Sequence, residues 1–100
     1  MGFNKLTAAQ AERLALLAEE LGEGVLAIGK ILRHGYDSVH PYDPDGPSNR
    51  QALEREMGDV RHAVARLCAA GDLDAREIDA AMDDKAERVA EYLHHQDRRP

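Results

Sequence analysis

Two pairs of acidic residues stand out because each interrupts an apolar pattern of helical spacing. Glu20 and Glu23 are three residues apart, and so are Glu56 and Asp59. Four carboxylates that converge in a partly buried place repel one another unless positive charge lies among them. A hard divalent cation supplies that charge, and ligation by oxygen alone favours Mg²⁺, or Mn²⁺, over zinc or copper. Mg²⁺ held in this way recruits phosphate oxygens, so the pairs predict a phosphate-binding metal site.

The first pair lies in a segment whose sequence predicts a long amphipathic helix. Thr7 and Gln10 form a capping-box pattern at its start. Apolar residues then recur at spacings of three and four: Leu14, Leu17, Leu21, Val25, Ile28 and Leu32. We predict a helix that ends near Arg33 and directs this stripe, centred on Leu21, into the core.

The rest of the chain predicts a long loop and two further helices. Residues 34–47 contain three prolines and two glycines, which exclude regular structure. Ser48 and Gln51 repeat the capping box and open a second helix that Gly71 ends. Asp74, with Glu77, opens a third before the polar tail. No segment alternates with the period of a strand, so we predict one all-α domain over residues 1–100.

The two acidic pairs occupy matching flanks of the first two helices. Glu20 and Glu23 lie roughly 100° and 160° from the centre of their stripe, and Glu56 and Asp59 roughly 60° and 120° from theirs, in the same rotational sense. Helices joined by one loop usually pack antiparallel, which turns equivalent flanks toward each other. The four carboxylates are therefore predicted to converge, and three alanines on the same side leave room for them: Ala27, Ala52 and Ala63.

A second apolar face on the first helix predicts self-association. Leu16 and Ile31 lie on the carboxylate side, away from the Leu21 stripe, and three helices cannot readily cover both faces. A chain of 100 residues also buries a modest fraction of its surface when it folds alone. We therefore expect a bundle of long antiparallel helices that is completed by homo-oligomerisation.

The charge and cysteine content of the chain limit the binding partners and the cellular compartment that we expect. The formal net charge is -6 and no basic block is present, which argues against nucleic-acid polymers and anionic membranes. The single cysteine, Cys68, cannot form an internal disulfide and fits a reducing compartment. The chain has no run of 18 apolar residues and no signal-peptide pattern. We expect a soluble, cytoplasmic protein.

The two acidic motifs resemble those of a known family. Glu19-Glu20-Leu21-Gly22-Glu23 and Glu56-Met57-Gly58-Asp59-Val60 resemble the paired ExxE and ExxD signature of the MazG-type all-α nucleoside triphosphate pyrophosphohydrolases. The resemblance implies a Mg²⁺-dependent enzyme that cleaves a nucleoside triphosphate into a monophosphate and pyrophosphate. It implies that Glu20, Glu23, Glu56 and Asp59 bind the metal, and that Glu19 holds or activates the attacking water.

The resemblance extends more loosely to the remaining site. It implies that Lys85 and Arg88, on the third helix, bind the phosphates, although the asparagine expected after Lys85 is absent. The loop is longer than in most members, and Tyr36 or Tyr42 within it is a candidate to stack on the base, with His34 or His40 as hydrogen-bond donors. Members are homodimers or homotetramers, which agrees with the doubly apolar first helix.

Two other interpretations remain open. Asp59 and His62 are three residues apart, as in di-iron bundles, but that site needs a second such pair and the first helix has no histidine beside Glu23. The second alternative is that the chain is a non-catalytic helical module that binds nucleotides or oligomerises. In an oligomerisation module whose acids only aid solubility, acidic residues would be scattered around the helices, and here they share matching flanks.

Overall fold

The computed structural model describes residues 3–96 and confirms the all-α class. The order of elements is α1 (Ala8–His34), α2 (Asn49–Ala69), α3 (Ala75–Val89) and a short 3-10 helix, η1 (Ala90–Tyr92). No strand occurs within residues 3–96, where one isolated bridge joins Val39 to Ser48. The ends of the predicted domain, residues 1–2 and 97–100, lie outside the described residues.

Both predicted capping boxes are confirmed. The Thr7 side chain accepts a hydrogen bond from the Gln10 backbone N–H, and the Gln10 side chain accepts one from the Thr7 N–H. Ser48 and Gln51 form the same pair at the start of α2. These bonds satisfy backbone donors that the first turn of a helix leaves without partners, so they fix where α1 and α2 begin.

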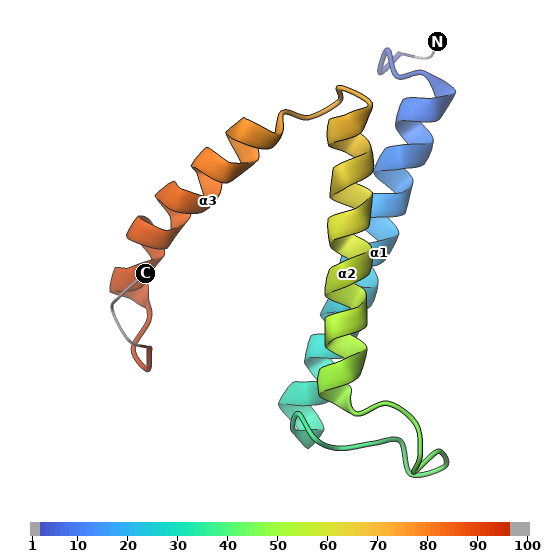
Figure 1. Cartoon of the computed structure of the whole chain (residues 1–100), viewed down its shortest axis with the longest axis vertical. Helices are drawn as coiled ribbons and strands as arrows, with labels where there is room; N and C mark the ends of the chain where they lie inside the picture. The colour runs from blue at the N-terminus through green and yellow to red at the C-terminus, as the bar shows by residue number, and fades with distance from the viewer. Residues whose placement is uncertain (1–2, 97–100) are drawn as a thin grey trace.

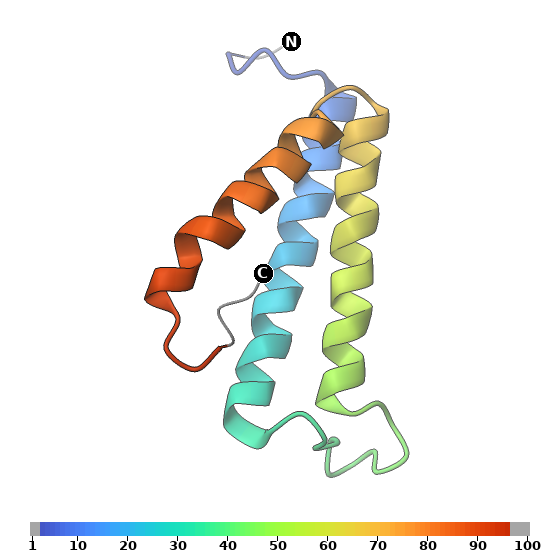
Figure 2. The same cartoon turned by 60° about the vertical axis from the view of Figure 1, so that its left-hand side comes forward.

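The first two helices form a long antiparallel hairpin, shown side by side in Figures 1 and 2. The buried residues of α1 are both small, Gly24 and Ala27. Those of α2 are Ala63 and Leu67. Small side chains let two helix backbones approach closely. Leu67 is the one large side chain that is fully buried among the described residues.

The structure corrects the predicted core face of α1. The Leu21 stripe lies roughly 90° around the helix from the face that contacts α2, and five of its six members are exposed: Leu14, Leu21, Val25, Ile28 and Leu32. Ile31, which we expected a partner subunit to cover, is instead half-buried on the side of Gly24 and Ala27. The periodicity identified the two apolar faces, but the Leu21 face that we predicted to form the core is the exposed one, and α2 packs on the other.

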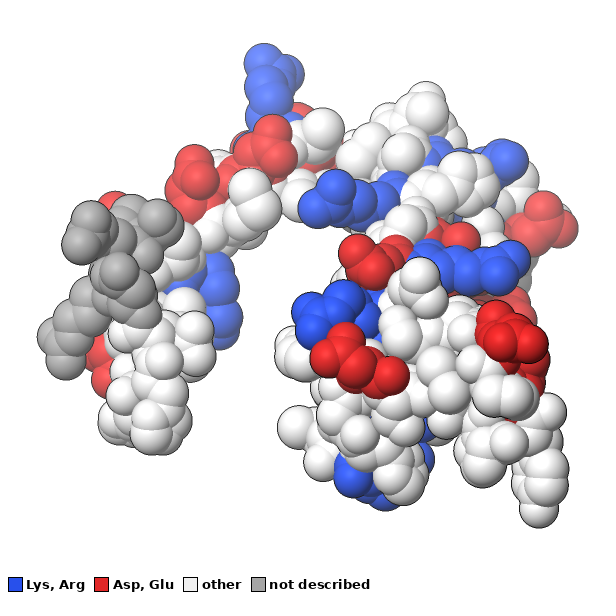
Figure 3. Space-filling model, turned by 60° about the horizontal axis from the view of Figure 1, so that its bottom comes forward, with Lys and Arg blue, Asp and Glu red and all other residues white. Residues whose placement is uncertain are grey.

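Helix α3 does not join the hairpin. Figures 1 and 2 show it leaving the end of α2 and diverging from both other helices. None of its residues is buried, and Ile78 and Met82 on its apolar side are exposed. Figure 3 shows the space between α3 and the hairpin open, with acidic and basic residues interspersed over the visible face. Within residues 3–96, one chain thus forms a hairpin and a separate helix, and no closed bundle.

Specific contacts hold the two ends of the hairpin. At the end opposite the loop, Arg13 Nε donates to Asp72 Oδ2 at 2.7 Å. At the loop end, the Arg50 N–H donates to the Tyr36 carbonyl at 2.8 Å, and the Arg50 guanidinium lies over the Tyr36 ring, 4.4 Å from its centroid. The Asn49 N–H also donates to the Ser38 carbonyl at 2.9 Å. The loop is therefore folded back onto the start of α2.

Candidate metal centre

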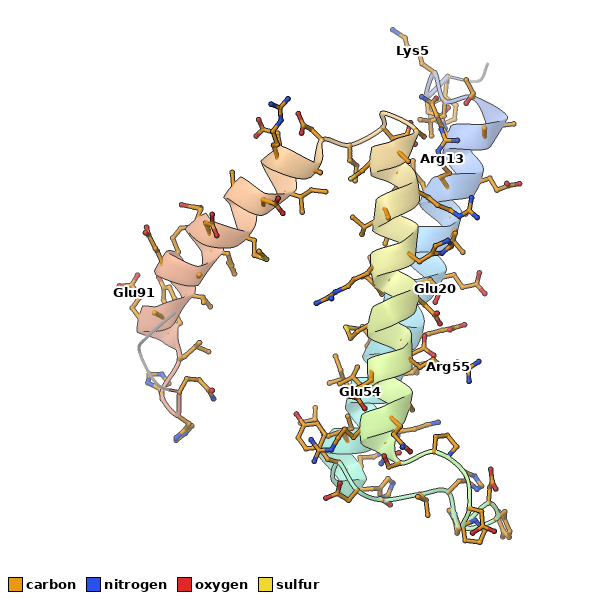
Figure 4. All side chains as sticks on the ribbon, viewed as in Figure 1. Lys5, Arg13, Glu20, Glu54, Arg55 and Glu91 are labelled. Atoms are coloured by element: carbon orange, nitrogen blue, oxygen red, sulfur yellow. The ribbon has the colours of Figure 1, made fainter. Side chains whose placement is uncertain are left out.

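Three of the predicted ligands meet between α1 and α2. Glu20 lies about halfway along the hairpin in Figure 4, on the face of α1 that contacts α2. Glu56 and Asp59 come from the facing side of α2, and one carboxylate oxygen from each of the three residues lies within 4.8 Å of the others. The predicted convergence of the two acidic pairs is confirmed for these residues.

Two carboxylate oxygens at this point lack hydrogen-bond partners. Glu20 and Glu56 are half-buried, and the Oε2 atom of each is fully covered without a donor within reach. Buried polar atoms are nearly always paired, so each unpaired one needs an explanation. No lysine or arginine of residues 3–96 forms an ion pair with either residue. Within residues 3–96 these two oxygens therefore have no partner.

The pKa values of Glu20 and Glu56 are both raised in this cluster. Burial raises the pKa of Glu20, and the negative charges of Asp59, Glu23 and Glu19 raise it further. Burial also raises the pKa of Glu56, as do a hydrogen bond with Glu23 and the charges of its acidic neighbours. Ionising all the carboxylates is unfavourable without added positive charge, as predicted for four converging carboxylates.

The fourth ligand and the additional acid lie beside this group. Glu23 is exposed, and its charge raises the pKa of both Glu20 and Glu56. Glu19 is exposed, and its charge raises the pKa of Glu20. Glu23 therefore lies outside the group of three carboxylates within 4.8 Å, and Glu23 and Glu19 both lie at its margin.

The donor set fits a hard divalent cation. All the converging atoms are carboxylate oxygens, the ligands that Mg²⁺ and Mn²⁺ prefer. His62, which the di-iron interpretation needs, accepts a hydrogen bond at Nε2 from Arg66 Nε at 3.1 Å and does not belong to the group.

No family model, curated protein or solved structure matches this chain. Its relation to the MazG-type enzymes therefore stays a prediction that rests on the two acidic motifs.

The remaining predicted site residues do not meet the carboxylates within one chain. Lys85 and Arg88 lie on α3, which diverges from the hairpin, and Arg88 Nε donates to Asp84 Oδ2 at 2.7 Å. One face of the Tyr36 ring is covered by Arg50, at the loop end of the hairpin.

Arg55 is a further cation on this side of the hairpin (Figure 4). Arg55 lies on the side of the hairpin where Glu20 is seen in Figure 4, and it forms no ion pair with any described residue. It is four residues before Asp59, so helical spacing places both on the same flank of α2. That spacing was visible in the sequence, but the charge of Arg55 is not among the causes of the raised pKa of Glu20 or Glu56, so Arg55 lies beside the centre without compensating it.

Proposed function

We propose that this chain is a Mg²⁺-dependent pyrophosphohydrolase that converts a nucleoside triphosphate into a monophosphate and pyrophosphate. The observation that carries the proposal is the pair of covered, unpartnered oxygens of Glu20 and Glu56, which face each other across the hairpin beside Asp59. An acidic protein with this arrangement attracts divalent cations, and through them the phosphates of a nucleotide.

The residues have defined parts in this reaction. Glu20, Glu23, Glu56 and Asp59 hold the metal, and Glu19 orients the water that attacks the α-phosphate. A bound Mg²⁺ neutralises phosphate oxygens and makes a coordinated water more acidic. The cluster tolerates full ionisation when the metal is present, because the charges that raise the pKa values of Glu20 and Glu56 are then compensated.

The active unit that we propose is a homodimer or a homotetramer. The Leu21 stripe of α1 and the apolar side of α3 are both exposed in a single chain, and water-exposed apolar patches of this kind typically mark interfaces. Another copy that covers them also offers its own Lys85 and Arg88 to the phosphates. None of the helices within residues 3–96 has the length and apolar character needed to cross a membrane.

Product analysis tests the reaction. We would incubate the protein with Mg²⁺ or Mn²⁺ and each common ribo- and deoxyribonucleoside triphosphate, adding several with altered bases, and separate the products by anion exchange. The proposal predicts monophosphate and pyrophosphate without diphosphate. Absence of turnover on the whole panel would favour the alternative, a non-catalytic nucleotide-binding or oligomerisation module.

A pair of matched variants links any activity to the cluster. Glu56→Gln removes one ligand charge and is expected to abolish turnover. Glu54→Gln is the control, because Glu54 is an exposed acid of the same helix that Figure 4 shows away from Glu20. Equal loss of activity in both variants, or full activity in Glu56→Gln with unchanged helical circular dichroism, would refute the ligand assignment.

A further inference from the structure

A second feature of the hairpin is a cavity at its loop end. Its volume is about 740 Å³, within the range of small-molecule sites. The last turns of α1, the loop and the first turn of α2 line it, and it is open to solvent on one side. The residues that matter here are Lys30, Arg33, His34, His40, Asn49 and Ala52. Tyr36 and Tyr42, the residues expected to stack on a base, do not line it.

The cavity holds cationic side chains that the protein itself does not neutralise. Lys30 and Arg33 form no ion pair with any residue in the range 3–96. Four described arginines are paired with aspartates, whereas several other described cations, such as Arg55, are unpaired like Lys30 and Arg33; what distinguishes Lys30 and Arg33 is that both line one cavity. Asp43 also contributes to the lining, and it is not within ion-pair distance of either cation. In a chain of net charge -6, two free cations around one cavity indicate an anionic ligand.

The cavity continues the flank that carries the carboxylates. Lys30 follows Glu23 by seven residues, and Ala52 precedes Asp59 by seven, so each pair is separated by two turns, or about 10 Å along the axis, on nearly the same side of its helix. One ligand that starts at the carboxylates and runs along this flank toward the loop therefore reaches the cations.

The directions of the side chains shorten this separation. Side chains on a helix lean toward its N-terminus. On α1 this inclines Lys30 toward the carboxylates, and on the antiparallel α2 it inclines Glu56 toward the cavity. The Arg33 guanidinium also lies back along α1, because its Nη1 is 3.4 Å from the position that a Cβ on Gly29 would occupy. Gly29 is on the side of α1 turned away from α2, so the exposed Arg33 side chain reaches the carboxylate flank only after a change of rotamer. A side chain at position 29 would crowd the guanidinium there.

We propose that this cavity binds the pyrophosphate end of the substrate, with Lys30 and Arg33 as the cations that contact the β- and γ-phosphates. The inference rests on the proposed function. In the reaction the water oxygen bonds to the α-phosphorus. The bond from that phosphorus to the bridging oxygen breaks, its electron pair stays on the pyrophosphate, and the water proton passes to solvent. Lys30 and Arg33 then stabilise the charge that the leaving group gains, and the nucleoside extends away from the loop.

Pyrophosphate itself is the probe that tests this assignment. Isothermal titration calorimetry in the presence of Mg²⁺ measures its affinity for the full chain, and backbone amide NMR shows which residues respond. We expect shifts at Lys30, Arg33 and the start of α2. Each of Lys30→Ala and Arg33→Ala removes a charged hydrogen-bonding group, so each is expected to weaken binding about tenfold or more.

Matched variants separate this site from nonspecific attraction and from α3. Arg61→Ala removes an exposed arginine from the opposite side of α2 and is expected to leave pyrophosphate affinity unchanged. Lys30→Arg keeps the charge and is expected to restore most of the affinity, which a merely structural defect in Lys30→Ala would not predict. Circular dichroism on every variant identifies any loss of helix.

Several results would overturn the assignment. One is wild-type affinity in both Lys30→Ala and Arg33→Ala, and another is loss of affinity in Lys85→Ala alone. If a nucleoside without phosphates shifts the amide signals of the cavity residues and pyrophosphate does not, the cavity binds the base instead. These outcomes are independent of turnover. If the unmodified chain hydrolyses a nucleotide and both variants bind pyrophosphate as it does, only this inference is refuted. If both variants lose pyrophosphate binding but the unmodified chain hydrolyses no nucleotide, only the proposed function is refuted.

Discussion

Replacing Leu32 by lysine tests whether another copy covers the exposed stripe of α1. Leu32 is 82% exposed in the single chain. Full burial of a leucine contributes about 1.5–3 kcal/mol, so the part covered within one chain contributes about 0.3–0.5 kcal/mol. Leucine and lysine have similar helix propensities, which leaves α1 otherwise unaffected. If the hairpin stood alone, Leu32→Lys would change the free energy of unfolding by about this small amount.

The expected effect is much larger if a second copy packs on the stripe. The variant then loses the whole burial term and places an unpaired ammonium in an apolar contact, in each of two subunits. Burial of the exposed part of Leu32 alone amounts to about 2.5–5 kcal/mol per dimer, which raises the dissociation constant at least roughly 70-fold. Sedimentation equilibrium over a wide range of protein concentration, with urea unfolding at two concentrations, measures both quantities.

Leu26→Lys is the control for this experiment. Leu26 is 69% exposed and lies off the Leu21 stripe, so its substitution adds the same charge on a different side of α1. We expect it to keep the oligomeric mass of the unmodified chain. The reasoning is refuted if Leu32→Lys keeps that mass as well, or if the unmodified chain is a monomer at every concentration.

Three further predictions concern the hairpin. Without divalent ions, the free energy of unfolding should rise as the pH is lowered through the raised folded-state pKa values of Glu20 and Glu56, and it should level off below the ordinary glutamate pKa of about 4.3. Saturating Mg²⁺ should remove this rise. A rise that persists in Mg²⁺ would contradict metal binding by the cluster. Arg13 holds the pKa of Asp72 below its ordinary value, so that ion pair should stabilise the fold above about pH 3.9 and be lost at lower pH; Asp72→Asn should abolish this step in acid titrations followed by circular dichroism. Leu67→Ala should cost about 3–5 kcal/mol in urea unfolding, because this side chain is fully buried, and a cost below about 1 kcal/mol would contradict the observed packing.

The sequence predicted the helix starts and the acidic cluster because both depend on local spacing. A capping box lies within four residues, as at Thr7 and Ser48, and its hydrogen bonds form in any context that allows a helix. The acidic pairs required one further assumption, that helices joined by a loop pack antiparallel, and the meeting of Glu20 with Glu56 follows from it.

The packing of α1 could not be predicted in the same way. Periodicity finds apolar faces, but it does not say which neighbour covers each one. The Leu21 stripe is the more apolar face, yet α2 packs on the face with Gly24 and Ala27, where small side chains permit close approach. The cavity at Lys30 was missed for a related reason, since its lining comes from two helix ends and a loop that meet only after folding.

The ion pair between Arg13 and Asp72 has a consequence for a site that it does not touch. A helix can slide along its partner in steps of one turn, 5.4 Å, without exposing a different face. Such a slip exceeds the 4.8 Å within which the oxygens of Glu20, Glu56 and Asp59 gather, so it would separate them. The ion pair at one end of the hairpin and the loop contacts at the other allow only one sliding position. They hold the two helices in the register at which the three carboxylates meet.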